Sequence, residues 1–272
     1  MCLNPIAITV KKRKYKASVG MFTLETEKKG GISKKTFVPC GKCARCQSKK
    51  RKDWAFRMYY ENMEQTYGWF VLLTYDEDHV PWLNKTTGEV FRKKDVDPKG
   101  FKETDNITRI VYKKDVQDFI KRLRAEQKYW SQKMSFENSQ IRYFIVSEYG
   151  TQQTRRPHYH AIIWGAHPYV MDKMGTQKKI WKCGFTNPQP LEQDMKAFMY
   201  VTKYLYKQKE LDKWPVRPFS LMSTKPYIGN YFEKVGKAYM LKNKTIVIET
   251  PNKRVQSIPR VYLDRLPKIT VE

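Results

Sequence analysis

Two histidines, His158 and His160, flank a single tyrosine in the stretch RRPHYHAIIWG, residues 155–165. The whole chain has only four histidines. Side chains at positions i and i+2 of a β-strand point to the same face of the sheet. If this stretch begins a strand, both imidazoles project together and could hold a divalent metal ion, a common role of neutral imidazole. The alternative is an ordinary pair of histidines at the end of a strand.

Glu148 ends the preceding apolar run and is the expected third ligand. If the runs 141–149 and 158–165 form a hairpin, Glu148 lies on the strand beside the histidine pair. Two imidazoles and one carboxylate leave coordination positions open for water and for substrate oxygens. Such a mixed set of ligands suits Mg²⁺ or Mn²⁺ when a phosphate completes the shell.

Two tyrosines four residues apart, Tyr200 and Tyr204, lie in the stretch MYVTKYLYK. On a helical wheel over residues 191–207, the buried stripe is expected to consist of Leu191, Met195, Phe198, Thr202 and Leu205. Both tyrosines fall on the opposite side, together with Lys196, Lys203 and Lys207. This pattern predicts that both hydroxyls lie on one lysine-rich face. The alternative is that the tyrosines pack, half exposed, against another layer.

A tyrosine on such a face could act as a covalent nucleophile. A phenol with a pKa near ~10 is a poor nucleophile at neutral pH. The nearby Lys203 and Lys207 would favour the phenolate, and a metal ion on the phosphate would withdraw charge. Attack on a phosphodiester would create a phosphotyrosine link and release a sugar hydroxyl. The second tyrosine could then attack in the next round.

The rest of the chain supplies elements that could position these residues. Strands are expected at 69–75, 141–149 and 158–165, and helices at 45–66, 112–129 and 191–209. Residues 76–108 are rich in Asp, Pro, Gly and Lys and are expected to form an excursion or mobile loop. From about residue 212 onward we expect short elements. Together these features indicate an α+β fold, with an antiparallel sheet flanked by helices.

The charge of the chain points to a polyanionic partner. There are 53 Lys and Arg residues against 27 acidic ones, which gives a net charge of +26. Nucleic acid is the leading candidate, and a ribosomal-type or membrane-surface protein is the alternative. The aromatic content of 14% favours single strands, because bases stack on rings. No apolar run approaches the ~20 residues that span a bilayer, and no secretory signal is visible, so we expect a cytoplasmic protein.

Four of the five cysteines could form a metal knuckle. Cys40, Cys43 and Cys46 have the spacing C-x₂-C-x₂-C, and Cys2 could supply the fourth thiolate of a tetrahedral zinc site. The fourth cysteine of a common iron–sulfur motif is missing, although a cluster or free thiols remain alternatives. Cys183 is expected to be a small buried residue. The knuckle would attach the N-terminus to the basic helix at 45–66.

Several motifs together resemble a known family. In chain order, LLTY (72–75), HYH (158–160) and YVTKY (200–204) resemble the three motifs of rolling-circle replication initiators, the HUH endonucleases. Further stretches are similar to the replication initiators of gokushoviruses, in the Microviridae: MCLNPI, VPCGKCARC followed by Trp54 and Arg57, EYG, RPHYH and PRVYLDRL. The resemblance covers nearly the whole chain.

The resemblance implies a five-stranded antiparallel catalytic sheet with the histidines on its central strands. It also implies that the protein nicks one DNA strand at the phage origin. A 5′-phosphotyrosine would form, and the free 3′-OH would prime synthesis by the host polymerase in the bacterial cytoplasm. By this resemblance His158 and His160 bind the metal, and Tyr200 and Tyr204 are the nucleophiles. The third ligand stays open between Glu148 and three residues after LLTY, which are Asp76, Asp78 and His79.

The expected DNA partners are the single-stranded origin and phage replicative DNA. Residues expected to contact DNA are Thr74, Tyr75, Lys49, Lys50, Arg51, Arg155 and Arg156. No ATPase motif is visible, so unwinding would need a host helicase. We expect three segments: 1–66 with the cysteine knuckle and basic helix, 67–211 as the catalytic core, and 212–272 as an extension packed on the core. The alternatives are a non-catalytic zinc-containing protein that binds single-stranded nucleic acid, and an HUH transposase or relaxase.

Overall fold

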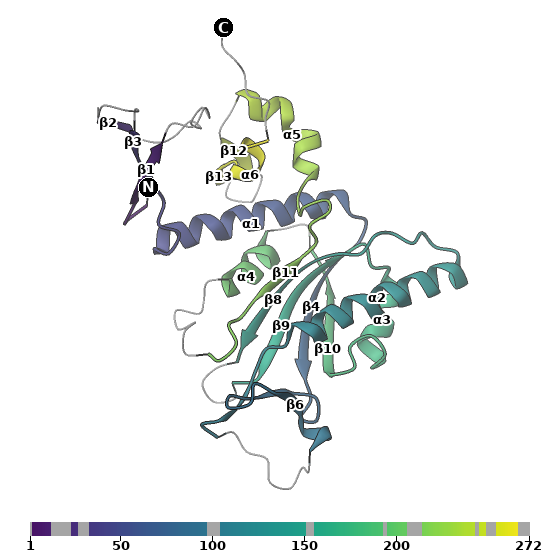
Figure 1. Ribbon diagram of the computed structural model, residues 1–272. Helices are drawn as coiled ribbons and strands as arrows, with labels where there is room; N and C mark the ends of the chain where they lie inside the picture. The colour runs from purple at the N-terminus through teal and green to yellow at the C-terminus, as the bar shows by residue number, and fades with distance from the viewer. Residues whose placement is uncertain are drawn as a thin grey trace. The chain divides into compact units, whose positions relative to one another are not determined.

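The computed structural model describes residues 2–11, 23–26, 33–96, 104–150, 155–192, 195–205, 214–242, 245–248 and 254–265 (Figure 1). The chain divides into two compact units. The larger unit comprises Ala55–Val235, and the smaller unit comprises Met1–Trp54 together with Gly236–Glu272.

The larger unit is built on a five-stranded antiparallel sheet with the strand order β10-β4-β9-β8-β11. The strands are β4 (Gly68–Tyr75), β8 (Arg142–Tyr149), β9 (Pro157–Trp164), β10 (Gly184–Pro190) and β11 (Ser220–Met222). The histidine pair lies on β9, the central strand. The α+β class, the five strands and the three predicted strands are therefore confirmed.

Two helices cover one face of this sheet. The predicted spacing of apolar residues holds in α2 (Lys113–Met134), which buries Val116, Phe119, Ile120 and Leu123 in the main core. This helix continues five residues beyond its predicted end and stops where Ser135 adopts a left-handed conformation. The second helix, α3 (Pro168–Thr176), packs against α2 and β10. It begins where Pro168 fixes the first turn and His167 Nδ1 accepts a hydrogen bond from the backbone N–H of Tyr169.

The opposite face of the sheet carries the histidines and is covered by two other helices. Helix α1 (Ala44–Glu64) covers one end of this face, where Asn62 Oδ1 accepts a 3.1 Å hydrogen bond from Trp164 Nε1. Helix α4 (Lys196–Tyr204) contacts β8 and β9 (Figure 1). The prediction for α1 is confirmed, but α4 begins later than the predicted residue 191. Leu191 instead extends the edge of the sheet, because its N–H donates to the carbonyl of Gly68 over 2.9 Å.

The segment 76–108 is more ordered than predicted. It contains a three-stranded sheet of order β6-β5-β7, built from β5 (Pro81–Asn84), β6 (Val90–Arg92) and β7 (Ile107–Arg109), and a short 3₁₀ helix η1 (Lys93–Asp95). The turn after β5 is held by Asn84, whose side-chain oxygen accepts hydrogen bonds from the N–H groups of Thr86 and Thr87. The many turn residues predicted a loop, but here they connect short strands.

The smaller unit contains two small antiparallel sheets. One has the order β1-β3-β2 and consists of β1 (Ile6–Lys11), β2 (Thr23–Thr26) and β3 (Ser33–Val38). The other pairs β12 (Thr245–Ile248) with β13 (Arg254–Ser257), and the short helix α6 (Arg260–Leu263) follows. Helix α5 (Tyr231–Lys242) has residues in both units. The expectation of short elements after residue 212 is confirmed for the described part of this region.

Among the described residues, no helix combines the length and the apolar character needed to cross a membrane. Residues 214–235 of the expected C-terminal extension belong to the larger unit, where β11 pairs with β8. Compact units report how residues cluster and not which residues carry a function. The expected division into three functional segments therefore stays a prediction.

Candidate active site

Glu148, His158 and His160 meet on one face of the central sheet. Glu148 on β8 is the direct register partner of His158 on β9, and His160 lies one step further along the same face. The Nε2 atoms of His158 and His160 lie 3.0 Å and 3.1 Å from the same oxygen of Glu148, Oε2. Glu148 and His160 are buried, whereas His158 is partly open to solvent. The predicted hairpin therefore brings the three expected ligands together.

A hydrogen bond to the backbone orients the ring of His158. Its Nδ1 lies 3.2 Å from the carbonyl oxygen of Arg156. A carbonyl oxygen can only accept, so this bond puts a proton on Nδ1 and turns Nε2 toward Glu148. In the neutral ring, Nε2 and the carboxylate oxygen would then be two acceptors 3.0 Å apart. Only a proton or a cation between them makes that approach favourable.

The geometry fits a six-coordinate divalent ion. The three ligand atoms lie within 4.8 Å of one another. An octahedral ion with bonds of about 2.0–2.1 Å holds adjacent ligand atoms about 3 Å apart, as seen here between each imidazole and Glu148. Histidine pairs that bind metals are usually fixed through the other ring nitrogen, as His158 is through Arg156. The donor set and the spacing both suit Mg²⁺ or Mn²⁺.

The alternative ligands after LLTY are engaged elsewhere. His79 Nδ1 lies 2.5 Å from Asp76 Oδ1, and the other oxygen of Asp76 lies 3.7 Å from Lys178 Nζ. The backbone carbonyl of Asp78 accepts from the N–H of Lys94. The fourth histidine, His167, caps α3. Within the described ranges, Glu148 is the carboxylate grouped with the histidine pair.

The two tyrosines of α4 lie directly against this ligand group. The ring of Tyr204 stacks on the ring of His160, with centroids 4.0 Å apart and an angle of 8° between the planes. The hydroxyl of Tyr204 donates a 2.6 Å hydrogen bond to the hydroxyl of Tyr200. Tyr200 also meets the edge of His160, at 5.7 Å between ring centroids. The metal-ligand candidates and both phenols therefore share one site.

The two tyrosines differ in exposure, which the wheel did not predict. Tyr200 is 45% exposed, but Tyr204 is only 8% exposed and lies among the buried residues of α4. The wheel assumed a longer helix, and in the shorter one Tyr204 turns toward the sheet. Burial raises the pKa of Tyr204 above its ordinary value, and the hydrogen bond to Tyr200 and the charge of Glu148 raise it further. The predicted lysine-favoured phenolate is therefore wrong for Tyr204 in this arrangement.

The predicted lysines of this helix contribute less than expected. Lys203 is exposed on α4, and Lys207 lies outside the described residues. Phe70 is a neighbour of the tyrosines that the sequence reasoning missed. Its ring meets the ring of Tyr200 at 5.8 Å in a T-shaped contact. Alternation along GWFVLLTY could have identified Phe70, because residues 70, 72 and 74 share one face of β4.

Thr74 and Tyr75 have opposite environments. Thr74 is the register partner of His158 and lies on the site face of β4. Tyr75 points to the other face and is fully buried, where its hydroxyl donates to Asp115 over 2.6 Å and lies 2.9 Å from the hydroxyl of Tyr159. The expected DNA contact of Tyr75 is therefore not available from its position, whereas that of Thr74 stays a prediction.

The expected basic DNA contacts fall in two places. In the smaller unit, Lys49 and Lys50 are exposed on α1 and Arg51 is half-buried, and Lys49 pairs with Asp53 over 3.2 Å. In the larger unit, Arg156 is paired with Glu77, and the guanidinium of Arg155 lies 5.9 Å from the ring centre of Trp214. Their contact with DNA stays a prediction.

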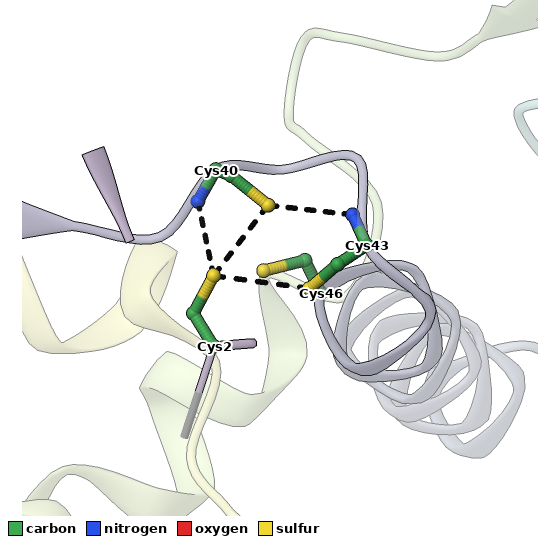
Figure 2. A group of neighbouring side chains, drawn as sticks. All are labelled: Cys2, Cys40, Cys43 and Cys46. Carbon is green, nitrogen blue, oxygen red and sulfur yellow. Dashed lines mark hydrogen bonds between the residues drawn. The ribbon is translucent and has the colours of Figure 1, made fainter. Parts of the chain in front are cut away.

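The four predicted zinc ligands gather at the start of α1 (Figure 2). Cys2 Sγ lies 3.5 Å from Cys40 Sγ and 3.8 Å from Cys43 Sγ. The backbone N–H of Cys40 donates to Cys2 Sγ, and that of Cys43 donates to Cys40 Sγ, each over 3.3 Å. Tetrahedral zinc with bonds of about 2.3 Å holds its sulfurs about 3.8 Å apart, so the group has the right size. Cys183 is buried elsewhere, as predicted.

The environment divides these thiols. Backbone hydrogen bonds from Leu3 and Cys46 lower the pKa of Cys43 to about 6. Backbone hydrogen bonds also lower the pKa of Cys40, whereas burial raises the pKa of Cys46 to about 12. At neutral pH, Cys43 is therefore a thiolate, the form that binds metals.

The fold and these two groups define a replication protein of viral type, and comparison with known proteins names its family. Residues 68–209 match the family of the replication-associated protein ORF2, and the chain belongs to this family. The match spans β4 to α4 and so includes the histidines, Glu148 and both tyrosines.

Two curated phage proteins are similar to most of the chain. The replication-associated protein VP4 of Bdellovibrio phage phiMH2K is 25% identical over 242 residues, which cover 83% of this chain and 66% of that protein. The replication-associated protein ORF4 of Chlamydia phage 1 is 26% identical over 261 residues, covering 86% of this chain and 55% of that protein. The chain thus spans just over half to two thirds of their length. The resemblance to gokushovirus replication proteins is confirmed, and no solved structure matches significantly.

Proposed function

We propose that this protein is a metal-dependent endonuclease that nicks and rejoins single-stranded DNA at a phage origin, using a tyrosine nucleophile. The observation that carries the proposal is the contact between the ligand group and the phenols: His160 bonds to Glu148 and stacks on Tyr204, which in turn bonds to Tyr200. Membership of a replication-associated family supports DNA as the substrate.

The proposed chemistry is a transesterification. The phenol oxygen of Tyr200 attacks the scissile phosphorus, the new O–P bond forms, and the bond between phosphorus and the 3′ oxygen breaks. The phenol loses its proton and the 3′ oxygen gains one, so no oxidant or external energy source is required. A divalent ion held by His158, His160 and Glu148 would polarise the phosphate. The free 3′-OH would prime synthesis.

The second phenol gives a route to rejoining. Tyr204 lies within hydrogen-bonding distance of Tyr200, so it could attack a newly made origin while Tyr200 still holds the first 5′ end. The released 3′-OH would then attack the first phosphotyrosine and close the circle. In this proposal the chain acts on origin and replicative DNA in the cytoplasm of the bacterial host, with a host helicase and polymerase as partners.

Incubation with single-stranded origin DNA and Mn²⁺ tests the proposal. We expect a covalent protein–DNA adduct that survives denaturing electrophoresis, and mass spectrometry should locate the 5′-phosphate on Tyr200 or Tyr204. Salt-sensitive binding without any adduct would instead support the non-catalytic alternative.

We further propose that Cys2, Cys40, Cys43 and Cys46 hold a structural zinc ion. The size of the sulfur group and the N–H···S bonds support this. Four thiolates close a tetrahedral site and leave no position for substrate, so the ion would fix the N-terminus to the start of α1 rather than take part in the reaction.

A further inference from the structure

An unusually exposed aromatic ring lies on the edge strand of the central sheet. Phe185 on β10 is 61% exposed, more than any other large apolar side chain in the described part of the chain. The strand shows a row of exposed side chains, because Asn187 and Gln189 follow on the same face. An edge strand normally avoids a bare aromatic ring, since it invites association. A ligand for this ring is therefore to be sought.

The backbone register connects Phe185 with the candidate active site. Phe185 is the partner of Thr74, Thr74 of His158, and His158 of Glu148, so these four residues form one row across β10, β4, β9 and β8. Register partners project from the same face. Because neighbouring strands lie about 4.8 Å apart, Phe185 is about 10 Å from His158 along the row. A stacked DNA strand covers that span in about three nucleotides, and an extended strand in fewer.

Positive charge surrounds the ring. Lys178 Nζ lies 5.3 Å from the centre of the Phe185 ring. Lys179 and Lys182, on the same connection between α3 and β10, are also exposed. Exposed aromatic rings beside lysines are the combination by which proteins bind single strands without regard to sequence: bases stack on the rings while phosphates meet the charges.

The ring is held in a fixed position. The residue before it, Gly184, has a φ of +154°, and a Cβ there would collide with the carbonyl oxygen of Thr74. Trp181 Nε1 donates to that same carbonyl over 2.8 Å. A hollow of about 160 Å³ beside the ring is lined by Lys178, Trp181, Gly184 and other residues of this connection. It is smaller than the roughly 300 Å³ of the smallest ligand pockets, so it suits a single flat ring at most.

We propose that Phe185 is a stacking platform for a base of the DNA strand beside the scissile phosphate, with Lys178 holding an adjacent phosphate. The proposal rests on the proposed function, because it assigns the strand that the nuclease would cut. The platform would set the direction in which DNA crosses the sheet. A second copy of this chain is the competing occupant of the exposed edge.

Anisotropy of a labelled oligothymidylate of about 20 nucleotides tests the platform. The full chain carrying Tyr200→Phe and Tyr204→Phe serves as the parent, so that no adduct forms. In this background we expect Phe185→Ala to weaken binding about tenfold and Phe185→Trp to retain it. Tyr129→Ala is the matched control, because Tyr129 is 53% exposed on α2, which covers the other face of the sheet. It should leave binding unchanged.

The salt dependence separates stacking from charge. Phe185→Ala should keep the slope of log affinity against log salt, whereas Lys178→Ala should lower it by about 0.7. An oligonucleotide with 5-iodouracil near the cleavage site should crosslink to Phe185.

Unchanged affinity in Phe185→Ala, or an equal loss in Tyr129→Ala, would overturn the proposal. So would sedimentation showing a dimer that Phe185→Ala dissociates. Adduct formation with wild-type affinity in Phe185→Ala would overturn the platform alone. Weaker binding in Phe185→Ala, in a parent chain that forms no adduct even with its tyrosines restored, would overturn only the nuclease.

Discussion

The imidazole of His160 lies flat on the phenol of Tyr204, with 4.0 Å between the ring centroids. This contact joins the central strand of the sheet to α4. The Nε2 atom of the same imidazole lies 3.1 Å from Glu148. One side chain therefore fixes the distance between the candidate metal ligands and the candidate nucleophiles, and the site depends on the packing of α4 as much as on the sheet.

The exposure of the phenols predicts the order of attack. Tyr200 is open to a DNA strand, whereas Tyr204 is stacked and buried. Tyr200→Phe should therefore reduce first-round adduct with single-stranded origin DNA by a factor on the order of 100 or more, the scale on which catalytic groups act. Tyr204→Phe should keep the first adduct and lose the rejoined product. A first adduct that maps to Tyr204 in the unaltered chain would contradict this order.

The shared oxygen of Glu148 predicts a strong effect of a small change. Glu148→Gln keeps the size of the side chain but removes the charge that faces both histidines. We expect Mn²⁺ affinity to fall about 10-fold to 100-fold, measured by calorimetry, and Mn²⁺-dependent cleavage to fall with it. His158→Ala should lose both. His79→Asn is the control, because His79 bonds to Asp76 outside the ligand group. Equal loss in the control would refute the assignment.

The sequence predicted the sheet side of the site better than the helix side. Alternation in β8 and β9 has a fixed period, so a single turn between them was enough to bring Glu148 beside His158. The role of Arg156 is carried by its backbone carbonyl, which no residue pattern reports. Phe185 was not singled out, because β10 was not predicted and its register decides where the ring points.

The helix side failed where the ends of α4 were misjudged. The wheel over 191–207 placed Tyr204 away from the core, but α4 begins at Lys196 and buries Tyr204 against His160. Helix ends depend on tertiary contacts, such as the bond that keeps Leu191 on the sheet edge. The cysteine spacing, in contrast, is local enough for Cys40, Cys43 and Cys46 to be grouped from the sequence.

The divided thiols predict a pH-dependent reaction of the zinc-free protein. The pKa of Cys43 is lowered to about 6 from an ordinary value of 9.0. The folded state therefore gains stability from this thiolate that is fully present above about pH 9 and is lost as the pH falls through about 6. After chelation, iodoacetamide should label Cys43 with a midpoint near pH 6 and leave Cys46 slow, as read by peptide mass spectrometry. Added zinc should protect both.

Zinc content provides the companion test for the cysteines. Cys43→Ser should lower the metal bound per chain, measured by elemental analysis, because a hydroxyl is a poor zinc ligand. His158→Ala should retain zinc, and so should Cys183→Ser, since Cys183 is buried outside the cluster. Full zinc content in Cys43→Ser would rule out the knuckle.

A buried ion pair predicts where the larger unit is most sensitive. Glu61 on α1 is fully buried and pairs with Arg142 on β8, with 3.1 Å between Glu61 Oε2 and Arg142 Nη2. The same Glu61 oxygen accepts from the N–H of Gly229 over 2.8 Å. Glu61→Ala would leave a buried guanidinium without its charge partner, so we expect the free energy of unfolding in urea to fall by about 3–5 kcal/mol.

Glu64, one turn further along α1, supplies the control for this pair. It also pairs with a base, Lys234, but both side chains are partly or largely exposed. Water screens such a pair, so Glu64→Ala should change the free energy of unfolding by no more than about 1 kcal/mol. Equal costs for the two substitutions would mean that the Glu61–Arg142 pair does not hold α1 to the sheet. The face that carries the histidines would then owe its order to the packing of α4 alone.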